Sequence, residues 1–371
     1  MQLANIFHLG VKEMRGLLRD GMLLMLIFYA FTFSIYTASR AVPETLNRAS
    51  ISVVDEDRSP LSSRIASAFY APYFSGPWLI SMSEMDSRMN TGLDTFALDI
   101  PPDFQRDLLA GKSPTIQLNI DATQILQAFT GGGYIQTIIT SEINEFLHRY
   151  RGVPELPVDL IARPRFNIEL NRSWFGSITS MISSITILTI VLTGAALIRE
   201  REHGTIEHLL VMPVTPFELM MSKIWSMGLV VLLVSTVSLI VVIQGLLAVP
   251  IEGSVPLFIV GAALHLFAAA CMGIFLATIA GTMSQFGLLL MLVMIPLEVL
   301  SGGLTPRESM PEIIQIIMLA APNTHFVMLA QSILFRGAGL SIVWPQFAAL
   351  FSIGAILFIF SLRRFRAFLA Q

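Results

Sequence analysis

A dense group of charged side chains lies between Arg199 and Trp225, and the segments on either side contain no Asp, Glu, Lys or Arg. These flanking segments, Trp174 to Ile198 and Ile224 to Ala248, are each 25 residues long. A helix needs about 20 apolar residues to cross the hydrocarbon core of a membrane. The group consists of Arg199, Glu200, Arg201, Glu202, His203, Glu207 and His208. Such side chains form ion pairs and charged contacts, so the pattern predicts a polar hinge between two membrane spans.

Within this hinge, the residues after Gly204 can form a short amphipathic helix. Thr205 can cap its start, Leu209 and Leu210 give it an apolar side, and Pro213 ends it. A helix of this kind can lie in a groove of a cytoplasmic partner. A solvated loop that holds positive-inside residues explains the same charges, so the residues alone leave both interpretations open.

One carboxylate, Glu298, lies within an otherwise uncharged run from Phe286 to Gly302. A helix rises about 1.5 Å per residue, which places Glu298 about 18 Å beyond Phe286 and still inside the bilayer. An ionisable residue at this depth is a functional candidate. Pairing with Arg307 or with a helix end near the outer surface is the equally weighted structural explanation.

Three other polar residues of the apolar segments are functional candidates: His265, Ser180 and Ser184. His265 could carry a proton or contact a substrate, although a packed, hydrogen-bonded histidine is the commoner case. The second apolar segment is rich in hydroxyl groups, which could line a path. Serine and threonine in such helices more often bond their own carbonyls or pack against neighbours.

Hydrolytic, metal and nucleotide chemistry find little support. The six histidines form no H-E-x-x-H motif, and Cys271 is the only cysteine, so we predict no metal site. Gly111-Lys112-Ser113 matches the end of a P-loop, but Arg106 stands where the motif requires its first glycine. We therefore expect no catalytic residue, no bound cofactor and no nucleotide site in this chain.

The composition indicates an integral membrane protein. The 371 residues are 54% hydrophobic and 13% charged, whereas soluble proteins average about 25% charged residues. The mean hydropathy is +0.70 and the formal net charge is −3. No positive cluster exceeds three residues, which argues against a nucleic-acid partner.

The chain begins with an amphipathic segment followed by a first span. Leu3 to Arg19 alternates apolar and charged residues at helical spacing, which predicts an interfacial helix within residues 1–20. Residues 21–39 form an uncharged run of 19 residues, long enough to cross a bilayer. A cleaved signal peptide would have a shorter apolar region and a better cleavage site, so we favour an uncleaved anchor.

Residues 40–172 have the character of a soluble α/β domain. We expect strands at Ile51 to Val54, Thr95 to Ile100 and Thr115 to Ile120. A long helix from Gln124 to Arg149 is expected to be interrupted by Gly131-Gly132-Gly133. Because this domain follows the first span, it belongs on the side of the membrane opposite the N-terminus.

Residues 173–371 are predicted to form a transmembrane domain with spans two to six. It includes the polar hinge at 199–223 and an outer re-entrant hairpin at 304–340, whose two apolar pieces are each too short to span. Six spans place the positive clusters on one side, which the positive-inside rule assigns to the cytoplasm. These clusters are Lys12, Arg15 and Arg19; Arg199, Arg201 and Lys223; and Arg363, Arg364 and Arg366.

Two motifs resemble the ABC-2 type permeases, the membrane subunits of ATP-binding-cassette exporters. The first is Arg199-Glu200-Arg201-Glu202 with Gly204-Thr205, Glu207, Leu209-Leu210, Pro213 and Lys223. The second is Leu300 to Pro311 followed by Pro322, which is similar to the end of the fifth span and the re-entrant helices of that family. The spacing of the outer domain is similar to the bacterial branch, so the resemblance covers essentially the whole chain.

The resemblance implies a polytopic α-helical membrane protein with six transmembrane helices and an inserted extracytoplasmic α/β domain. It implies a half-transporter in the bacterial inner membrane that pairs with itself or a paralogous permease and is driven by a separate cytoplasmic ATPase, which uses the ATP. The residues implied to contact the ATPase are Glu200, Arg201, Glu202, Gly204, Thr205 and Glu207. Those implied for the outer gate are Ser301, Gly302, Gly303, Pro306 and Pro311.

We expect an amphipathic cargo, either drug-like or lipid-linked, because the apolar segments contain no ring of polar residues. The outer domain could admit this cargo or dock a periplasmic adaptor, and membrane lipids surround the spans. Two alternatives stay open. A sensor or scaffold would bind a ligand through its ectodomain without transport. An ion-coupled transporter would show inverted repeats and paired intramembrane charges.

Overall fold

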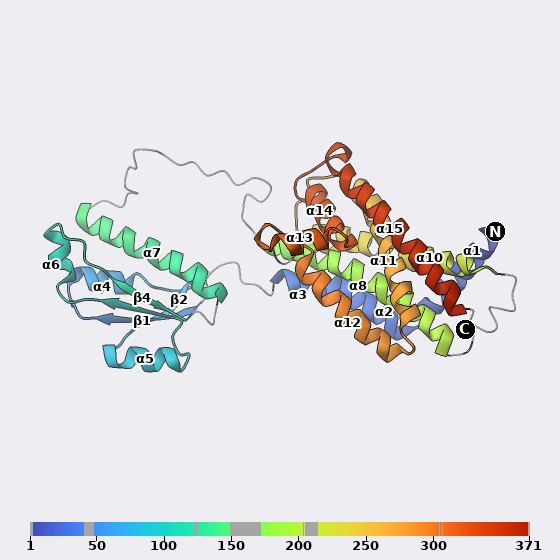
Figure 1. Cartoon of the computed structure of the whole chain (residues 1–371). Coiled ribbons are helices and arrows are strands. Elements are labelled where there is room, and N and C mark those ends of the chain that lie inside the picture. Colours follow the sequence, from blue (N-terminus) through green and yellow to red (C-terminus); the bar gives the residue numbers. More distant parts are fainter. Residues whose placement is uncertain are drawn as a thin grey trace. The chain divides into compact units, whose positions relative to one another are not determined.

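The computed structural model describes residues 3–40, 48–121, 125–148, 172–202, 204, 214–303, 305 and 307–369. The chain divides into two compact units (Figure 1). The helical unit comprises Met1–Val42 and Pro164–Gln371, and the sheet-containing unit comprises Pro43–Arg163.

The helical unit begins with α1 (Leu3–Arg19), whose apolar and charged residues alternate at helical spacing as predicted. Asp20 then caps the next helix, because its Oδ1 accepts a hydrogen bond of 3.1 Å from the backbone N–H of Leu23. The first candidate span, Gly21–Arg40, is built from α2 (Gly21–Phe28), the π-helical segment η1 (Tyr29–Phe33) and α3 (Ser34–Arg40).

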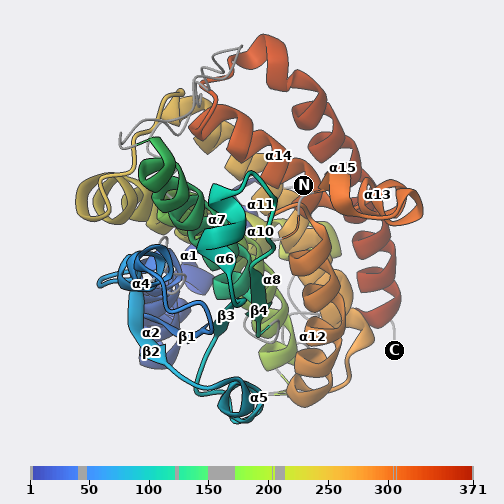
Figure 2. The ribbon, with the colours of Figure 1, turned by 90° about the vertical axis from the view of Figure 1, so that its left-hand side faces the viewer.

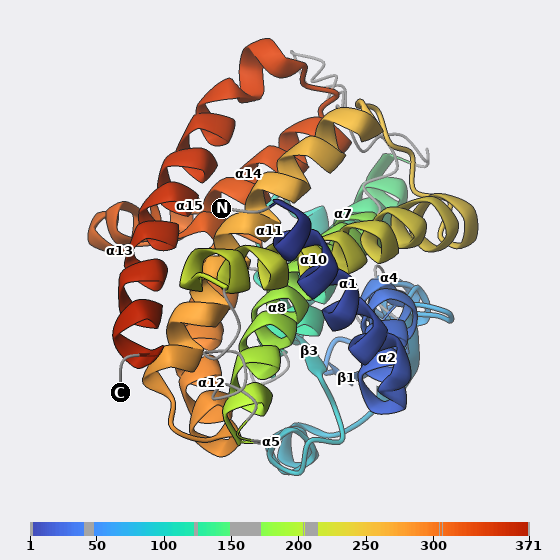
Figure 3. The same cartoon turned by 90° about the vertical axis from the view of Figure 1, so that its right-hand side faces the viewer.

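Five further helices are long and apolar enough to cross a membrane, which gives six candidate spans among the described residues. They are α8 (Arg172–Glu202), α10 (Pro216–Ser238) continued by η2 (Leu239–Leu246), α11 (Val255–Ile279), α12 (Met283–Leu300) and α15 (Leu340–Leu369). Helix α8 is central in the helical unit (Figure 3). In its most apolar stretch of 18 residues, 83% is buried, compared with 11% in the corresponding stretch of α12.

Helices α8 and α11 approach each other closely at two glycines. A Cβ atom added to Gly273 would lie 2.4 Å from Thr193 Oγ1, and one added to Gly194 would lie 3.1 Å from the Gly273 carbonyl oxygen. Neither position can hold a larger side chain without displacing a neighbour. The close contact explains why these two apolar helices form the centre of the unit.

The segment predicted as a re-entrant hairpin at 304–340 contains two helices, α13 (Glu312–Met318) and α14 (Pro322–Leu334). The pair is bent by 91° at the break between them, so the part of the chain that the structure describes has six candidate spans, or seven if the bent pair counts as one. A short 3-10 turn, η3 (Arg307–Ser309), precedes α13.

The sheet-containing unit has four strands in the order β2-β1-β3-β4, which Figure 2 shows. Strand β1 (Ala49–Asp55) pairs in parallel with β2 (Phe74–Leu79) and β3 (Phe96–Ile100), and β4 (Gln117–Ile120) is antiparallel to β3. Its helices are α4 (Pro60–Ser67), α5 (Met82–Asn90), α6 (Phe104–Leu109) and α7 (Ile125–His148).

Alternate residues of β1 serve two cores on opposite faces of the sheet. Ile51 and Val53 pack with Ile65 of α4 and Ile135 of α7, whereas Val54 packs with Met85 of α5. In Figure 1, α4 and α7 accordingly lie on one side of the sheet and α5 on the other. The expected strands at 51–54, 95–100 and 115–120 correspond to β1, β3 and β4, and β2 was not predicted.

The predicted interruption of the long helix at Gly131-Gly132-Gly133 is wrong, because α7 runs unbroken from Ile125 to His148. Gly131 has a packing role instead. A Cβ atom at this position would lie 2.2 Å from the ring of Phe96 in β3. The glycine therefore lets α7 approach the sheet.

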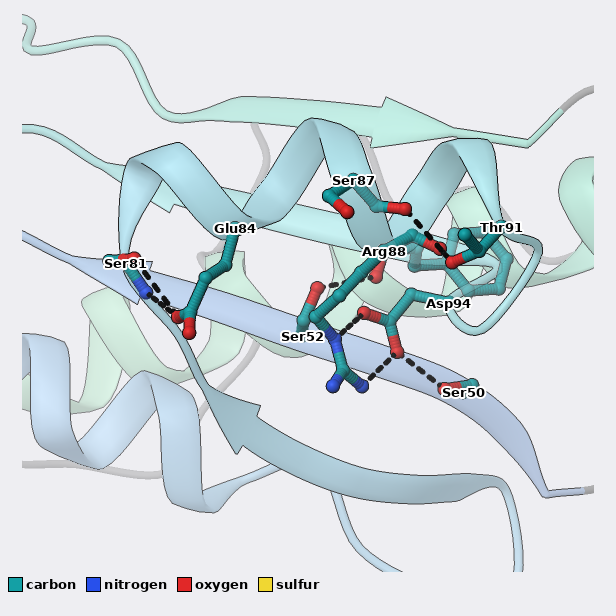
Figure 4. A network of polar contacts seen from close by, with 9 residues as sticks. Ser50, Ser52, Ser81, Glu84, Ser87, Arg88, Thr91 and Asp94 are labelled. Atoms are coloured by element: carbon teal, nitrogen blue, oxygen red, sulfur yellow. Dashed lines mark hydrogen bonds and ion pairs between the residues drawn. The ribbon is translucent and has the colours of Figure 1, made fainter.

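A polar network joins α5 to strand β1 (Figure 4). Arg88 donates two hydrogen bonds to the fully buried carboxylate of Asp94, at 2.6 and 3.0 Å, and Ser50 of β1 donates a third at 2.7 Å. Burial raises the pKa of Asp94, but the hydrogen bonds from Arg88, Ser50 and Ser52 and the charge of Arg88 together lower it by a larger amount. The net pKa lies below the usual value, so Asp94 is a charged, structural group.

Candidate functional site

Helix α1 packs on α10 (Figure 3), and Trp225 lies at the contact. The Trp225 ring stacks on Phe7 with centroids 5.8 Å apart, and its Nε1 donates a 3.0 Å hydrogen bond to the Ile6 carbonyl. Gly10 leaves room for the indole, because a Cβ atom there would lie 2.2 Å from Trp225 Cζ2. The contact fixes α1 against the first turns of α10.

A buried ion cluster lies at the same junction. Lys223 Nζ is 3.0 Å from Glu13 Oε1 of α1 and 2.7 Å from Glu200 Oε2 of α8, and the Lys223 side chain is 2% exposed. Lys12 approaches Glu200 from the exposed side at 3.9 Å. Burial raises the pKa of Glu13, but the charge and hydrogen bond of Lys223 help to lower it by a larger amount. The pKa of Glu13 therefore lies below its usual value. The cluster joins three helices.

The neighbouring charges of α8 connect it to two other places in the unit. Arg199 Nη1 pairs with Asp20 at 2.8 Å, at the start of the first span. Arg201 Nη1 donates to the Ala280 carbonyl at 3.2 Å, and Glu202 Oε1 accepts from the Met283 N–H at 2.9 Å. Arg201 and Glu202 thus hold the turn between α11 and α12.

The predicted hinge at 199–223 is shorter in the structure. Helix α8 continues to Glu202 and α10 begins at Pro216, because Thr215 and Glu218 form a reciprocal capping box. Gly204 is exposed with a φ of +65°, a conformation that favours glycine. Thr205 and Glu207 lie outside the described residues, as does the short helix predicted there.

A second polar group lies inside the helical unit, among otherwise apolar residues. Thr186 Oγ1 of α8 is 2.8 Å from His265 Nε2 of α11, and it donates a 2.9 Å hydrogen bond to Asn323 Oδ1 of α14. His265 is fully buried and stacks on Phe326 with ring centroids 4.2 Å apart. Three helices therefore meet at one threonine hydroxyl.

The Glu298 carboxylate accepts a hydrogen bond from Ser183 Oγ of α8. The pairing with Arg307 that sequence alone left open is not among the ion pairs of the described residues. The second carboxylate oxygen of Glu298, Oε1, is buried and has no hydrogen-bond partner in the described part of the chain. Such an oxygen can accept a hydrogen bond from a bound molecule.

The two candidate serines have different surroundings. Ser184 is buried and donates to the Ala30 carbonyl at 3.2 Å, which ties α8 to the first span. Ser180 is half-buried. Among the described residues, neither serine hydrogen-bonds to Thr186, His265 or Asn323. The structure therefore forms two separate groups, Ser183 with Glu298 and Thr186 with His265 and Asn323.

Three of the five residues predicted for an outer gate line a pocket of about 370 Å³. Ser301, Gly302 and Gly303 line it, with Gly302 at a φ of +95°. Pro311 is the residue before α13, and Pro306 lies outside the described residues.

Glu13, Asn323 and Arg336 were not singled out from the sequence, although each belongs to one of these groups. Glu13 lies 210 residues from Lys223. A lysine at the edge of an apolar run needs a charged partner, which is a signal that a partner exists but not where it lies. Asn323 and Arg336 carry no local signal.

Among the residues that the structure describes, no group of three or more His, Cys, Asp or Glu side chains is placed to hold a metal ion. Lys112, in the sequence that partly matches a P-loop, pairs with Asp107 at 3.0 Å.

The long apolar helices and the polar groups between them indicate a membrane protein with several candidate spans. A family model described as ABC-2 family transporter protein matches residues 21–363. The chain belongs to this family of transport permeases, and the predicted resemblance is confirmed.

Several relatives share nearly the whole chain. The inner membrane transport permease YhhJ of Escherichia coli strain K12 is 58% identical over 364 residues, or 98% of this chain and 97% of that protein. The probable multidrug ABC transporter permease YbhR of the same strain is 26% identical over 338 residues, 90% of each chain. The probable multidrug ABC transporter permease YbhS is 25% identical over 348 residues, 89% of this chain and 88% of that one.

Proposed function

We propose that this chain is the membrane-spanning subunit of an ATP-driven exporter, paired with a second copy or a paralogous permease and driven by separate ATPase subunits. Membership of the ABC-2 family implies an ATPase partner. The chain itself binds no cofactor, and the ATPase uses the ATP. Its place is the inner membrane, as the name of the YhhJ relative supports.

The observation that carries this proposal is the set of charged contacts at one end of the helical unit. Lys223 joins α10 to Glu13 of α1 and Glu200 of α8. Arg201 and Glu202 join α8 to the turn between α11 and α12. A force applied to the segment between Glu202 and Thr215 therefore reaches several helices at once.

ATP-driven closure of the ATPase subunits would push on this segment and on α1, and the helices would rock as a body. Glu200 is engaged with Lys223, with its side chain 14% exposed, so its role is to transmit the movement. The direct contact falls on the exposed end of α8 and on Gly204, Thr205 and Glu207. This division separates the transmitting residues from the contacting ones.

Both termini are cytoplasmic in this proposal, and the α/β unit is extracytoplasmic. The assignment is supported by the positive clusters in α1, at the end of α8 and in the last turns of α15, which six spans place on one side. The α/β unit then admits cargo or docks a periplasmic adaptor. Its exposed Tyr70, Trp78 and Leu79 suit such a contact.

The path for cargo uses Glu298 and the hydroxyls of α8, with the Ser301 to Gly303 segment as its outer gate. Glu298 has a buried oxygen without a partner in the described part of the chain. Its helix, α12, is largely exposed and can face a second protomer. The cargo is a small amphipathic molecule, drug-like or lipid-linked, in keeping with the multidrug permease names of two relatives.

The test is purification of the tagged chain from its native membrane in mild detergent. We expect a nucleotide-binding ATPase to co-purify in a fixed ratio. Its absence under several gentle conditions would contradict an ATP-driven mechanism. The sensor and ion-coupled alternatives would then be separated by ligand binding to the α/β unit and by the ion dependence of transport in vesicles.

A further inference from the structure

The pocket beside the predicted outer gate is lined by residues from five segments of the helical unit. Its volume is about 370 Å³, within the usual range for a small-ligand site. Phe175 comes from the start of α8, Ser301 follows α12, Arg307 lies in η3, Gln331 in α14 and Arg336 directly after α14.

Two donors in this pocket are buried without an acceptor. Arg307 Nη2 donates to the Gln315 carbonyl at 3.3 Å, and Nη1 has the sulfur of Met328 at 3.7 Å. Arg307 Nε and Gln331 Nε2 are buried and have no hydrogen-bond partner within the described part of the chain. Leaving a buried donor unpaired is energetically unfavourable, so an acceptor in the pocket would be bound favourably.

The charges of the pocket are positive and uncompensated. Neither Arg307 nor Arg336 has an ion pair among the described residues, and no described lining residue is acidic. In the proposed orientation these arginines lie on the outer side, where membrane proteins carry fewer basic residues. Two guanidinium groups at one pocket are well suited to a phosphate oxyanion, which they bind through several parallel hydrogen bonds.

One wall of the pocket is apolar. Phe175 is 41% exposed and stacks on Phe335, with centroids 5.6 Å apart and the rings nearly parallel. Val327 and Met328 lie on the same lining. The site thus offers basic donors beside a surface that can hold the first methylene groups of an acyl chain.

We propose that this pocket binds a phosphate-type oxyanion, carried by a lipid headgroup or free in solution. Arg307 and Gln331 supply the buried donors and Arg336 supplies the second positive charge. The proposal rests on the proposed function only for placing the pocket on the outer side, since the binding chemistry is independent of an ATPase.

Native mass spectrometry of the purified full-length chain in detergent tests this, without ATP or a partner. Three probes are compared: phosphatidylglycerol, diacylglycerol with the same acyl chains, and inorganic phosphate. The variants are Arg336→Gln, Arg307→Gln and both together. Arg364→Gln, which removes an exposed charge near the end of α15, is the matched control.

We expect one phosphatidylglycerol per chain, bound about ten-fold or more tightly than diacylglycerol. In Arg336→Gln we expect this preference for phosphatidylglycerol to be lost. Arg364→Gln should bind as the wild type does. Displacement of the lipid by inorganic phosphate would assign the free ion, and retention of the lipid would assign the headgroup. Equal binding of phosphatidylglycerol and diacylglycerol, or an unchanged preference in the double variant that elutes as a folded protein, would overturn the proposal. Arg336 is exposed, so Arg336→Gln gives a result even if Arg307→Gln fails to fold.

Discussion

Lys223 Nζ lies 2.7 Å from Glu200 Oε2, and this ion pair joins the second turn of α10 to the last turn of α8. Glu13 of α1 shares the same lysine at 3.0 Å. Two carboxylates with one buried lysine form a unit in which each member depends on the others. The pair therefore marks the place where movement of one helix must be accompanied by movement of the other two.

Lys223→Met is expected to destabilise the protein, because it removes the buried positive charge between Glu13 and Glu200 and leaves only the exposed Lys12 near Glu200. Removing one partner of a buried pair costs about 3–5 kcal/mol. Chemical unfolding of the purified chain measures this loss. Lys12→Met is the control: its side chain is 60% exposed, and an exposed pair contributes less than about 1 kcal/mol. Equal stability of the two variants would argue against the cluster.

Gly10→Ala is expected to loosen α1 from α10. The new Cβ atom would lie 2.2 Å from the Trp225 ring, and overpacking of this kind costs about 1–3 kcal/mol. Gly16→Ala, in the same helix, has no atom within 4 Å of its added Cβ and should be neutral or stabilising by up to about 1 kcal/mol. Melting temperatures of the two variants check the difference. If both shift in the same direction, α1 is not seated as described.

Thr186→Val keeps the side-chain volume but removes the hydroxyl that meets both His265 and Asn323. We expect a loss of about 1–3 kcal/mol, since buried polar groups on two helices lose their partner. Thr189→Val should have a smaller effect, because the Thr189 hydroxyl bonds the carbonyl of Ile185 in its own helix. Thermal unfolding of both variants is the measurement, and a larger effect at Thr189 would contradict this account.

The stability of the α/β unit should fall in acid through Asp94. The folded pKa of this carboxyl is lowered, so its contribution is fully present above the unfolded value of about 3.9 and is lost as the pH falls through the folded pKa. Hydrogen exchange of β1 and β3 in the intact chain reports this loss. Asp94→Asn should reduce protection already at neutral pH and remove this part of the acid dependence.

Asp86→Asn is the control for this prediction, because Asp86 is exposed on the same helix, α5. It should leave exchange of the two strands unchanged at neutral pH. If Asp94→Asn behaves in the same way, the network of Arg88, Ser50 and Asp94 does not hold α5 to the sheet.

Local patterns were sufficient to predict most of the helices. Uncharged runs of 19 residues or more correspond to long helices, and three of the four strands follow from β-type runs. Strand β2 was missed because Phe74–Leu79 contains Gly76 and Pro77, which argue against a strand locally. Pairing with β1 decides that segment.

The contacts within the candidate sites could not be predicted in the same way. Thr186 and Asn323 are 137 residues apart, and Glu13 and Lys223 are 210 residues apart. A single sequence contains no local signal for such pairs, since they depend on how the helices pack. The same limit explains why Glu200 was expected at a partner surface and lies in a buried ion pair.

The central claim, that an ATPase acts on the segment between α8 and α10, is tested most directly by how much ATPase co-purifies with variants of that segment. The comparison is between the Thr205→Ala, Glu207→Ala double variant and Glu252→Ala, an exposed change beyond the other end of α10 and η2. We predict that the ratio of ATPase to permease falls sharply in the double variant and stays at the wild-type value in Glu252→Ala. An unchanged ratio in the folded double variant would contradict the account.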